Sequence, residues 1–195
     1  MNDDRKWIIV RIDGKIAAIS ADYRQLASIT ARLAKDGKAR FSEITAKTAD
    51  FDEVWQLKKT AGWEDMMLFG TEFQKKVWKK LFEMTHGDSA DSAPKLICYS
   101  DFAELCQNRA GVRAVAHAIG LNPVSVVIPC HLVVPKEAID RMKNINKKAE
   151  ATIFTGVDLC LSSILKDEGM DFGNYAMGPE LKRKLISLEL TGTDL

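Results

Sequence analysis

A largely apolar, β-branched run from Asn122 to Val134 constrains the fold more than any other stretch of this chain. Stiff β-branched side chains favour strands, so we predict a strand that carries Cys130. His131 follows directly, and a thiol and an imidazole are the side chains best suited to nucleophilic chemistry near neutral pH. Taken alone, a cysteine in an apolar run more often serves packing than chemistry.

Composition narrows the classes of protein that this chain can be. With 195 residues, 46% of them hydrophobic, it can bury a core as one sizeable domain or two small ones. Its formal net charge of +1 indicates neither a nucleic-acid nor a membrane partner, so any DNA contact depends on where lysines and arginines lie. Four cysteines without a C-x-x-C pair and three histidines support neither a zinc site nor a disulfide framework. We therefore expect no metal and no cofactor.

The start of the chain and its apolar runs bear on location. The start lacks a signal-peptide pattern, and no apolar run approaches the ~18 residues of a membrane span. We expect an intracellular protein with reduced thiols, in the cytoplasm and associated with the nucleoid in a bacterial cell. We also expect a monomer without membrane contact.

Residues 1–69 are predicted to form a small α/β structural domain. The runs Lys6–Ile12 and Lys15–Ile19 flank Asp13-Gly14, which supplies the positive φ values of a tight hairpin turn. Asp22 is placed to cap a helix that Gly37 ends, with Leu26, Ile29 and Leu33 on one face. From there to Trp63 the apolar residues are poorly periodic, so we predict only mixed structure.

Residues 70–195 are predicted to form a second domain, with an inserted segment at about 135–166. Thr71 and Gln74 have the spacing of a capping box at a helix start. Apolar residues then recur at helical spacing, namely Phe73, Val77, Trp78, Leu81 and Phe82. His86 begins a polar linker and is predicted to be a loop residue.

Two short helices follow, at about 100–107 and 112–121, joined by a turn with Gly111, and they resemble a helix-turn-helix. The second is rich in small residues and can approach another backbone closely, while Arg113 at its start could reach a phosphate or a base stack. Burial of this helix by close packing, with Arg113 on the rim, fits about equally well. The predicted fold class is α+β, a small N-terminal hairpin-and-helix unit followed by a mostly helical domain.

The C-terminal part of the chain places an acid at an unusual position. The segment Pro135–Leu165 is basic and polar in its first half, and its apolar second half suits a helix with Val157, Leu161, Ile164 and Leu165 on one face. After turn-like residues 167–175, Pro179 opens a final helix. Glu189 closes this helix at the end that disfavours a carboxylate, so we expect it to have a specific partner.

Six motifs occur in order along the second domain. They are Gly70-Thr-Glu-Phe-Gln-Lys-Lys-Val-Trp78, Tyr99, Arg113-Ala-Val115, Asn122-Pro123, Ile128-Pro-Cys-His131 and Gly173-Asn-Tyr-Ala-Met-Gly178. In this order and spacing they resemble the O6-alkylguanine-DNA alkyltransferase family, whose members move an alkyl group from guanine to their own cysteine. The resemblance covers about residues 70–134 and 167–189, and it reverses the odds against a chemical role for Cys130.

The resemblance implies a set of catalytic roles. Cys130 is similar to the acceptor thiol, which must become a thiolate to displace guanine from the alkyl carbon. His131 resembles the base that takes the thiol proton through a water, and Glu189 the carboxylate that orients this base. Asn122 resembles the residue that braces the active-site turn. Tyr99 resembles the tyrosine that protonates or hydrogen-bonds the departing guanine.

The resemblance also implies binding surfaces and an activity. Arg113 is similar to the arginine that fills the vacated base stack, with Ala114 and Ala118 on the helix in the minor groove. Residues similar to those that line the family's base pocket are Tyr99, Ile119, Val133, Tyr175 and Ala176. The implied activity is DNA repair by direct reversal, in which O6-alkylguanine in double-stranded DNA is flipped out and its alkyl group is transferred once per protein molecule.

Three departures from the family pattern keep alternatives open. Leu132 stands where the family usually has Arg, Met177 stands where a small residue is usual, and the 135–165 segment is longer than the usual link. They motivate an alternative, a protein that binds alkylated bases with weak or no transfer. A Cys-His hydrolase unrelated to DNA is disfavoured, because no oxyanion-hole glycine motif is present.

Overall fold

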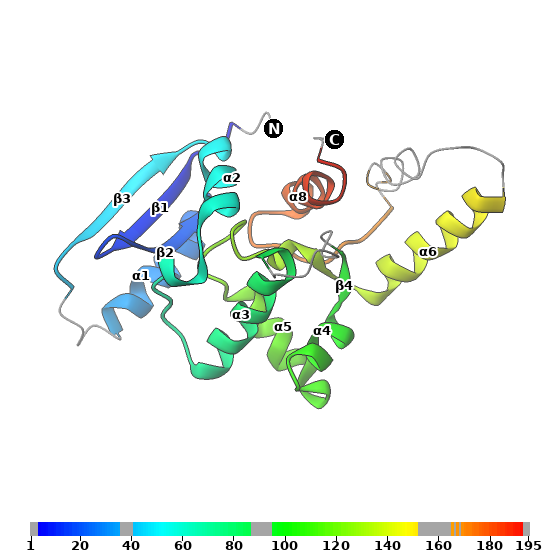
Figure 1. Ribbon diagram of the computed structural model, residues 1–195, viewed down its shortest axis with the longest axis horizontal. Helices are drawn as coiled ribbons and strands as arrows, with labels where there is room; N and C mark the ends of the chain where they lie inside the picture. The colour runs from blue at the N-terminus through cyan, green and yellow to red at the C-terminus, as the bar shows by residue number, and fades with distance from the viewer. Residues whose placement is uncertain are drawn as a thin grey trace. The chain divides into compact units, whose positions relative to one another are not determined.

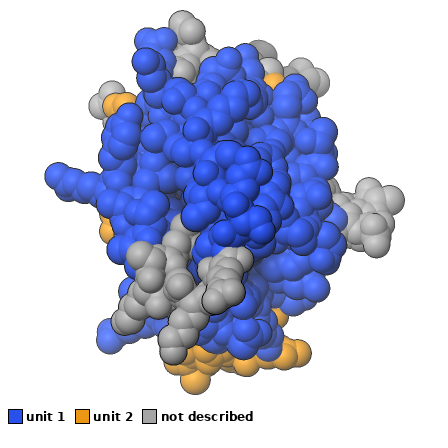
Figure 2. Space-filling view, turned by 90° about the vertical axis from the view of Figure 1, so that its left-hand side faces the viewer, with its two compact units in different colours: residues 1–88, 113–130 blue, residues 89–112, 131–195 orange. Residues whose placement is uncertain are grey.

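The computed structural model describes residues 4–35, 41–86, 95–151, 165, 167 and 169–192 (Figure 1). The chain divides into two compact units, which Figure 2 distinguishes by colour. Unit 1 comprises residues 1–88 and 113–130, and unit 2 comprises residues 89–112 and 131–195. The predicted domain boundary at residue 70 stays a prediction about sequence organisation. The compact units divide the chain elsewhere, because residues 113–130 belong with the N-terminal part.

The N-terminal part of unit 1 is a three-stranded antiparallel sheet of order β2-β1-β3. The predicted hairpin is confirmed, with β1 at Trp7–Ile12 and β2 at Lys15–Ser20 around the positive-φ residues Asp13 and Gly14. The third strand, β3 at Ile44–Ala49, pairs with β1 and lies in the stretch for which only mixed structure was predicted. Five of its six residues are exposed, so it lacks the alternation that marks a half-buried strand.

Helices cover the two faces of this sheet, since successive strand residues point to opposite sides. Helix α1 (Tyr23–Lys35) places Leu26 and Ile29 against Val10 and Ile12. Helix α2 (Phe51–Thr60) brings Phe51 to Trp7, with ring centroids 6.0 Å apart. The Asp22 side chain accepts from Arg24 N at 2.8 Å at the start of α1. Gly37, predicted to end α1, lies outside the described residues.

Helix α3 (Glu72–His86) begins with the predicted capping box. Gln74 N donates to Thr71 Oγ1 at 3.2 Å, and Thr71 N donates to the Gln74 side chain at 2.9 Å. The prediction that His86 is a loop residue is wrong. His86 is the last residue of α3, stacks on Phe82 with centroids 3.8 Å apart, and places Nε2 2.6 Å from the Lys58 carbonyl oxygen.

Trp78 connects α3 to α5 (Val112–Gly120) within unit 1. Its buried indole Nε1 donates to the carbonyl oxygen of Ala118 at 2.8 Å. The indole also leaves no room for a side chain at Gly70, where a Cβ atom would lie 2.7 Å from the Trp78 ring. The Gly70 motif therefore serves the packing that holds α5.

Unit 2 contains helices around a two-stranded parallel pairing of β4 (Ile97–Cys98) with β5 (Val133–Val134). Helix α4 (Tyr99–Leu105) follows β4, and a 3-10 turn at Arg109–Gly111 leads into α5, so the helix-turn-helix elements occur in the predicted order. No secondary structure was predicted for the basic and polar first half of the 135–165 segment. It forms one helix, α6 (Lys136–Ala151), which leads away from β5 (Figure 1).

Helix α6 and the final helix α8 (Pro179–Thr191) share a hydrophobic cluster. Ala138 of α6 and Ile186 of α8 pack there with Leu165, Met170 and Phe172. The other apolar residues predicted for a helix near 153–165 lie outside the described residues. Within the described part of the chain, no helix is long and apolar enough to span a membrane. The sheet-and-helix unit and the helical remainder confirm the α+β fold class.

Candidate active site

The segment after α5 is held by the edge of the N-terminal sheet. Ile19 N donates to the Pro123 carbonyl at 2.9 Å, and Ser125 N donates to the Ile19 carbonyl at 3.0 Å. This pairing stops at once, because Val126 has a φ of +74° and the chain turns back, with Ile128 N donating to the Val124 carbonyl at 3.0 Å. The turn therefore depends on β2 for its position.

The prediction of a strand through Cys130 is wrong. Cys130–Leu132 forms a 3-10 turn, and only Val133–Val134 is a strand. The left-handed conformation at Val126 interrupts the extended chain that β-branched residues favour. One tight turn thus carries both residues. Cys130 is the last residue of unit 1, and His131 begins the second segment of unit 2.

Asn122 is the centre of the unit 1 side of this site. Its side-chain nitrogen donates to the Ile128 carbonyl at 2.9 Å and to Cys130 Sγ at 3.2 Å. Its side-chain oxygen accepts from Val124 N at 3.0 Å. Because a carbonyl can only accept and a backbone N–H can only donate, these partners fix the orientation of the amide. Asn122 thereby braces the turn from inside while it is only 1% exposed.

Cys130 is close to fully buried, with 9% of its surface exposed. Its backbone N–H donates to the Ile128 carbonyl at 2.8 Å, which fixes the main chain at the sulfur. The N–H of Asn122 that points at Sγ is a better partner for a thiolate than for a thiol, because hydrogen bonding to a charged form favours that form. The geometry suits a cysteine that reacts as its anion.

In unit 2, His131 and Glu189 form a buried pair. His131 Nε2 lies 3.0 Å from Glu189 Oε1, and their side chains are 0% and 5% exposed. A carboxylate at this distance orients the ring and stabilises the imidazolium over the neutral form. The acid at the unfavourable end of α8 therefore has a partner, and a proton taken up by His131 has a counter-charge.

Lys182 is a second buried charge beside the same segment, and no pattern in the sequence marks it as a site residue. It is 1% exposed, and its Nζ donates to the Val133 carbonyl at 2.9 Å. Helix α8 thus contacts the stretch after Cys130 at two points, through Lys182 and, two turns later, through Glu189.

The residues predicted to contact the flipped base fall in both units. In unit 2, Val133 is fully buried, Tyr99 and Tyr175 are half-buried, and Ala176 is exposed. A Cβ atom at Gly173, where φ is +81°, would lie 3.7 Å from Tyr99 Oη, so unit 2 brings Tyr99 to the loop before Tyr175. Ile119 belongs to unit 1 and is 5% exposed.

The predicted DNA-binding residues on α5 are not equally accessible. Arg113 and Ala114 are exposed. Ala118 is 1% exposed, and its carbonyl holds the Trp78 indole. Ala118 thus lies on the packed side of α5, and we retain only Arg113 and Ala114 for a DNA-facing surface. Leu132, which replaces the family's usual Arg, is fully buried.

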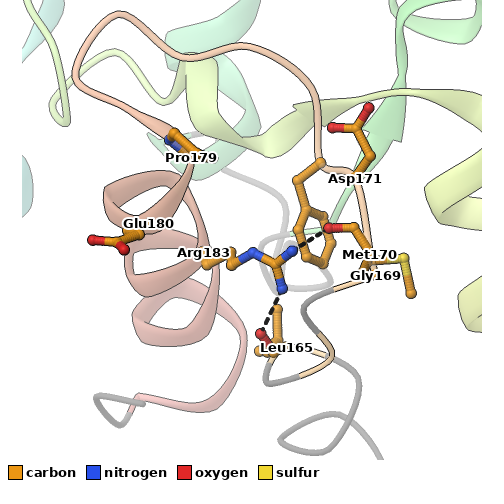
Figure 3. Close-up of a pocket in the computed structure, with 8 residues that line it drawn as sticks. Leu165, Gly169, Met170, Asp171, Pro179, Glu180 and Arg183 are labelled. Atoms are coloured by element: carbon orange, nitrogen blue, oxygen red, sulfur yellow. Dashed lines mark hydrogen bonds between the residues drawn. The ribbon is translucent and has the colours of Figure 1, made fainter.

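A pocket of about 540 Å³ in unit 2 is separate from these residues (Figure 3). Its walls include Phe172, Glu180 and Arg183, and none of the predicted site residues lines it. The Arg183 guanidinium is engaged there with backbone carbonyls, among them those of Leu165 and Met170. The residues that line this pocket include neither a cysteine nor a histidine.

Part of the chain is similar to known methyltransferases. Residues 72–152 match the DNA-binding domain of the 6-O-methylguanine DNA methyltransferase family. A probable methylated-DNA–protein-cysteine methyltransferase of Acanthamoeba polyphaga mimivirus is 44% identical over 72 residues, which are 37% of this chain and 44% of that protein. The inducible methylated-DNA–protein-cysteine methyltransferase of Bacillus subtilis is 43% identical over 67 residues, 34% of each chain.

These matches span less than half of either relative. The solved structure of the O6-methylguanine-DNA methyltransferase of the archaeon Pyrococcus kodakaraensis is similar over more of the chain. The likeness covers 97% of this chain and 95% of that one, with a TM-score of 0.55 and 20% identity. At this identity the likeness concerns the fold, and it extends to the N-terminal part, which lies outside the family match at residues 72–152.

Proposed function

We propose that this chain repairs O6-alkylguanine in DNA by moving the alkyl group to Cys130, since residues 72–152 match the DNA-binding domain of the 6-O-methylguanine DNA methyltransferase family. The observation that carries the proposal is the setting of the nucleophile. Cys130 Sγ accepts an N–H from Asn122, and the next residue is a histidine paired with a buried carboxylate. An inert packing cysteine has no need of either partner.

The proposed reaction is an in-line substitution at the alkyl carbon. His131 takes the thiol proton through a water, and Glu189 balances the charge of the imidazolium that results. The thiolate forms the S–C bond while the C–O6 bond breaks, and the electron pair of that bond goes to guanine. The departing base then takes a proton, for which Tyr99 is the proposed donor. The net change is one thioether and one restored guanine.

The product explains why the protein would act once. Water does not readily displace the cysteine sulfur from the alkyl carbon of a thioether. The alkyl group therefore stays on Cys130, and each molecule would repair one lesion. The target atom is out of reach inside a duplex, so the base must be flipped out. We propose that the residues that contact the flipped base are Tyr99, Ile119, Val133, Tyr175 and Ala176.

DNA contact is proposed for the exposed start of α5. Arg113 would fill the space that the flipped base leaves, and Ala114 would allow close approach to the minor groove. Arg113→Ala should slow methyl transfer from duplex DNA by about tenfold, since one side chain that holds a deformed duplex is worth a few kcal/mol at most. Reaction with free O6-methylguanine should be unchanged. Equal losses with both substrates would remove Arg113 from this role.

The activity is tested by mixing the protein with a duplex oligonucleotide that contains one O6-methylguanine, in the presence of a chelator. Intact-protein mass should rise by one CH2 group as the lesion disappears from the DNA. Cys130→Ser should bind the same duplex without either change. Native protein that binds the duplex, gains no mass and leaves the lesion in place would instead support a damage-binding protein without transfer.

A further inference from the structure

Gln25, on α1 of the N-terminal domain, contacts the residue that braces the nucleophile. Its Nε2 donates to the backbone carbonyl of Asn122 at 3.0 Å, across 97 positions of sequence. Its Oε1 accepts from the Ser20 hydroxyl at 2.5 Å. Because the Asn122 carbonyl can only accept, Nε2 must face it, so the orientation of the Gln25 amide is fixed from both ends.

We propose that Gln25 is a positioning residue for Cys130 that acts through Asn122. The proposal rests on the proposed function only in naming alkyl transfer as the reaction that benefits. A chain of three contacts carries it, from the buried Ser20 to Gln25, from Gln25 to the Asn122 main chain, and from the Asn122 side chain to Cys130 Sγ. No step of this chain leaves unit 1.

The contact is to the backbone carbonyl of Asn122, and the backbone conformation at Asn122 sets the direction in which its side chain projects. The Gln25 amide fixes the Asn122 carbonyl, while the pairing of Ile19 with Pro123 and Ser125 fixes the peptides that follow. Together these bonds set the main-chain dihedrals from which the Asn122 side chain projects towards Sγ. If the carbonyl is released, the peptide plane can rotate and the 3.2 Å contact to sulfur lengthens.

Through Gln25 and β2, the N-terminal residues would help to position Cys130 for the reaction. The sheet and α1 contain none of the residues that touch the alkyl group in the proposed reaction. They supply the edge strand and the amide that hold the active-site turn in place. A hydrogen bond from a neutral amide to a buried carbonyl contributes a modest amount, so we expect a graded effect on rate rather than loss of activity.

Gln25→Glu is the sharpest variant, because it keeps the shape and the bond from Ser20 but removes the N–H donor. Gln25→Met removes the donor without adding a charge, and it serves if the half-buried carboxylate of Gln25→Glu prevents folding. Gln56→Glu, the same change at an exposed position of α2, is the matched control.

The first readout needs no DNA. Iodoacetamide labelling of Cys130 is followed by peptide mass at a series of pH values, with Cys98 and Cys106 as internal references. In Gln25→Glu and Gln25→Met the labelling of Cys130 should be about fivefold slower near neutral pH, the value of about one neutral hydrogen bond. Its pH profile should move to higher pH, because a loosened Asn122 contact favours the thiolate less. Gln56→Glu should match the native protein.

The second readout is the single-turnover rate of methyl transfer from the O6-methylguanine duplex, which should fall by the same factor with the duplex dissociation constant unchanged. Native labelling rates and an unmoved pH profile in both Gln25 variants would overturn the proposal. The two ideas fail separately. A native protein that gains no methyl group refutes the proposed function, whereas slower Cys130 labelling in the variants still supports the role of Gln25.

Discussion

The two sides of the peptide bond between Cys130 and His131 are built from different chemistry. On the Cys130 side, unit 1 uses neutral groups, the Asn122 and Gln25 amides and the backbone of β2. On the His131 side, unit 2 uses buried charged side chains, Glu189 and Lys182. Neutral hydrogen bonds thus position the proposed nucleophile, and buried charged side chains contact the segment that carries the proposed base.

The difference follows from what each side must do. A neutral hydrogen bond costs little to bury and fixes direction, so it suits a sulfur that must point at one carbon atom. A buried charge is expensive unless it is paired, so it persists where a proton must be received. We therefore expect changes on the Glu189 side to act mainly on rate, and changes on the Asn122 side to act on stability and rate together.

The largest effect is expected from Glu189→Gln. Glutamine keeps an oxygen for His131 Nε2 but removes the negative charge that balances the imidazolium. The single-turnover rate of methyl transfer should fall by about 100-fold, within the range for a positioned acid–base group. The free energy of unfolding should change by less than about 1 kcal/mol, because the hydrogen bond remains.

Glu180→Gln, at an exposed position in the first turn of the same helix, is the matched control and should react like the native protein. A Glu189→Gln rate within twofold of native would mean that His131 does not rely on the carboxylate, and the contrast between the two sides would be lost.

Asn122→Ala should have the next largest effect, and mainly on stability. It leaves the Val124 N–H without its side-chain acceptor and removes one of the two N–H groups that the Ile128 carbonyl accepts. The free energy of unfolding should fall by about 2–4 kcal/mol, and the transfer rate should fall with it. Urea unfolding measures the first quantity. Asn144→Ala, on the exposed face of α6, is the control and should leave both quantities unchanged. If Asn122→Ala were as stable as the native protein, the turn would not depend on the Asn122 side chain.

The smallest effect is expected from the exposed pair on α6. The Lys136 ammonium donates to Asp140 at 2.6 Å, and this hydrogen bond raises the pKa of Lys136 above 10.5. A raised lysine pKa stabilises the fold below the unfolded pKa, and the benefit is lost as pH rises through the folded value. Asp140→Asn should therefore lower Tm by no more than about 2 °C at pH 7, and the difference should vanish well above pH 10.5. A larger shift in thermal melts would mean that exposed charges matter as much as buried ones.

Local signals predicted much of the fold. The Asp13-Gly14 hairpin, the Thr71 capping box and the Pro179 helix start each depend on residues within a few positions of one another, and each occurs as predicted. Helix α6 could also have been found, because Ala138, Ile139, Met142 and Ile145 recur on one helical face within a polar stretch.

Contacts over long sequence separations explain what could not be predicted. The β-branched run predicted a strand at Cys130, but pairing with Ile19 and the left-handed Val126 turn the chain instead. Nothing near Gln25 indicates that it reaches Asn122, and nothing near Lys182 indicates that it is buried beneath Val133. Motif order pointed to Cys130, His131 and Asn122, and the end of the final helix pointed to Glu189. The contacts of Gln25 and Lys182 emerge only from the folded chain.

The most direct test of the central claim is a titration with peptide mapping. Native protein is incubated with increasing amounts of the O6-methylguanine duplex, and the modified peptide is identified by mass spectrometry. We predict that repaired guanine rises to one per protein molecule and stops there, with the methyl group on Cys130 and on no other cysteine. Repair that continues past one equivalent, or a methyl group on another residue, would contradict the account.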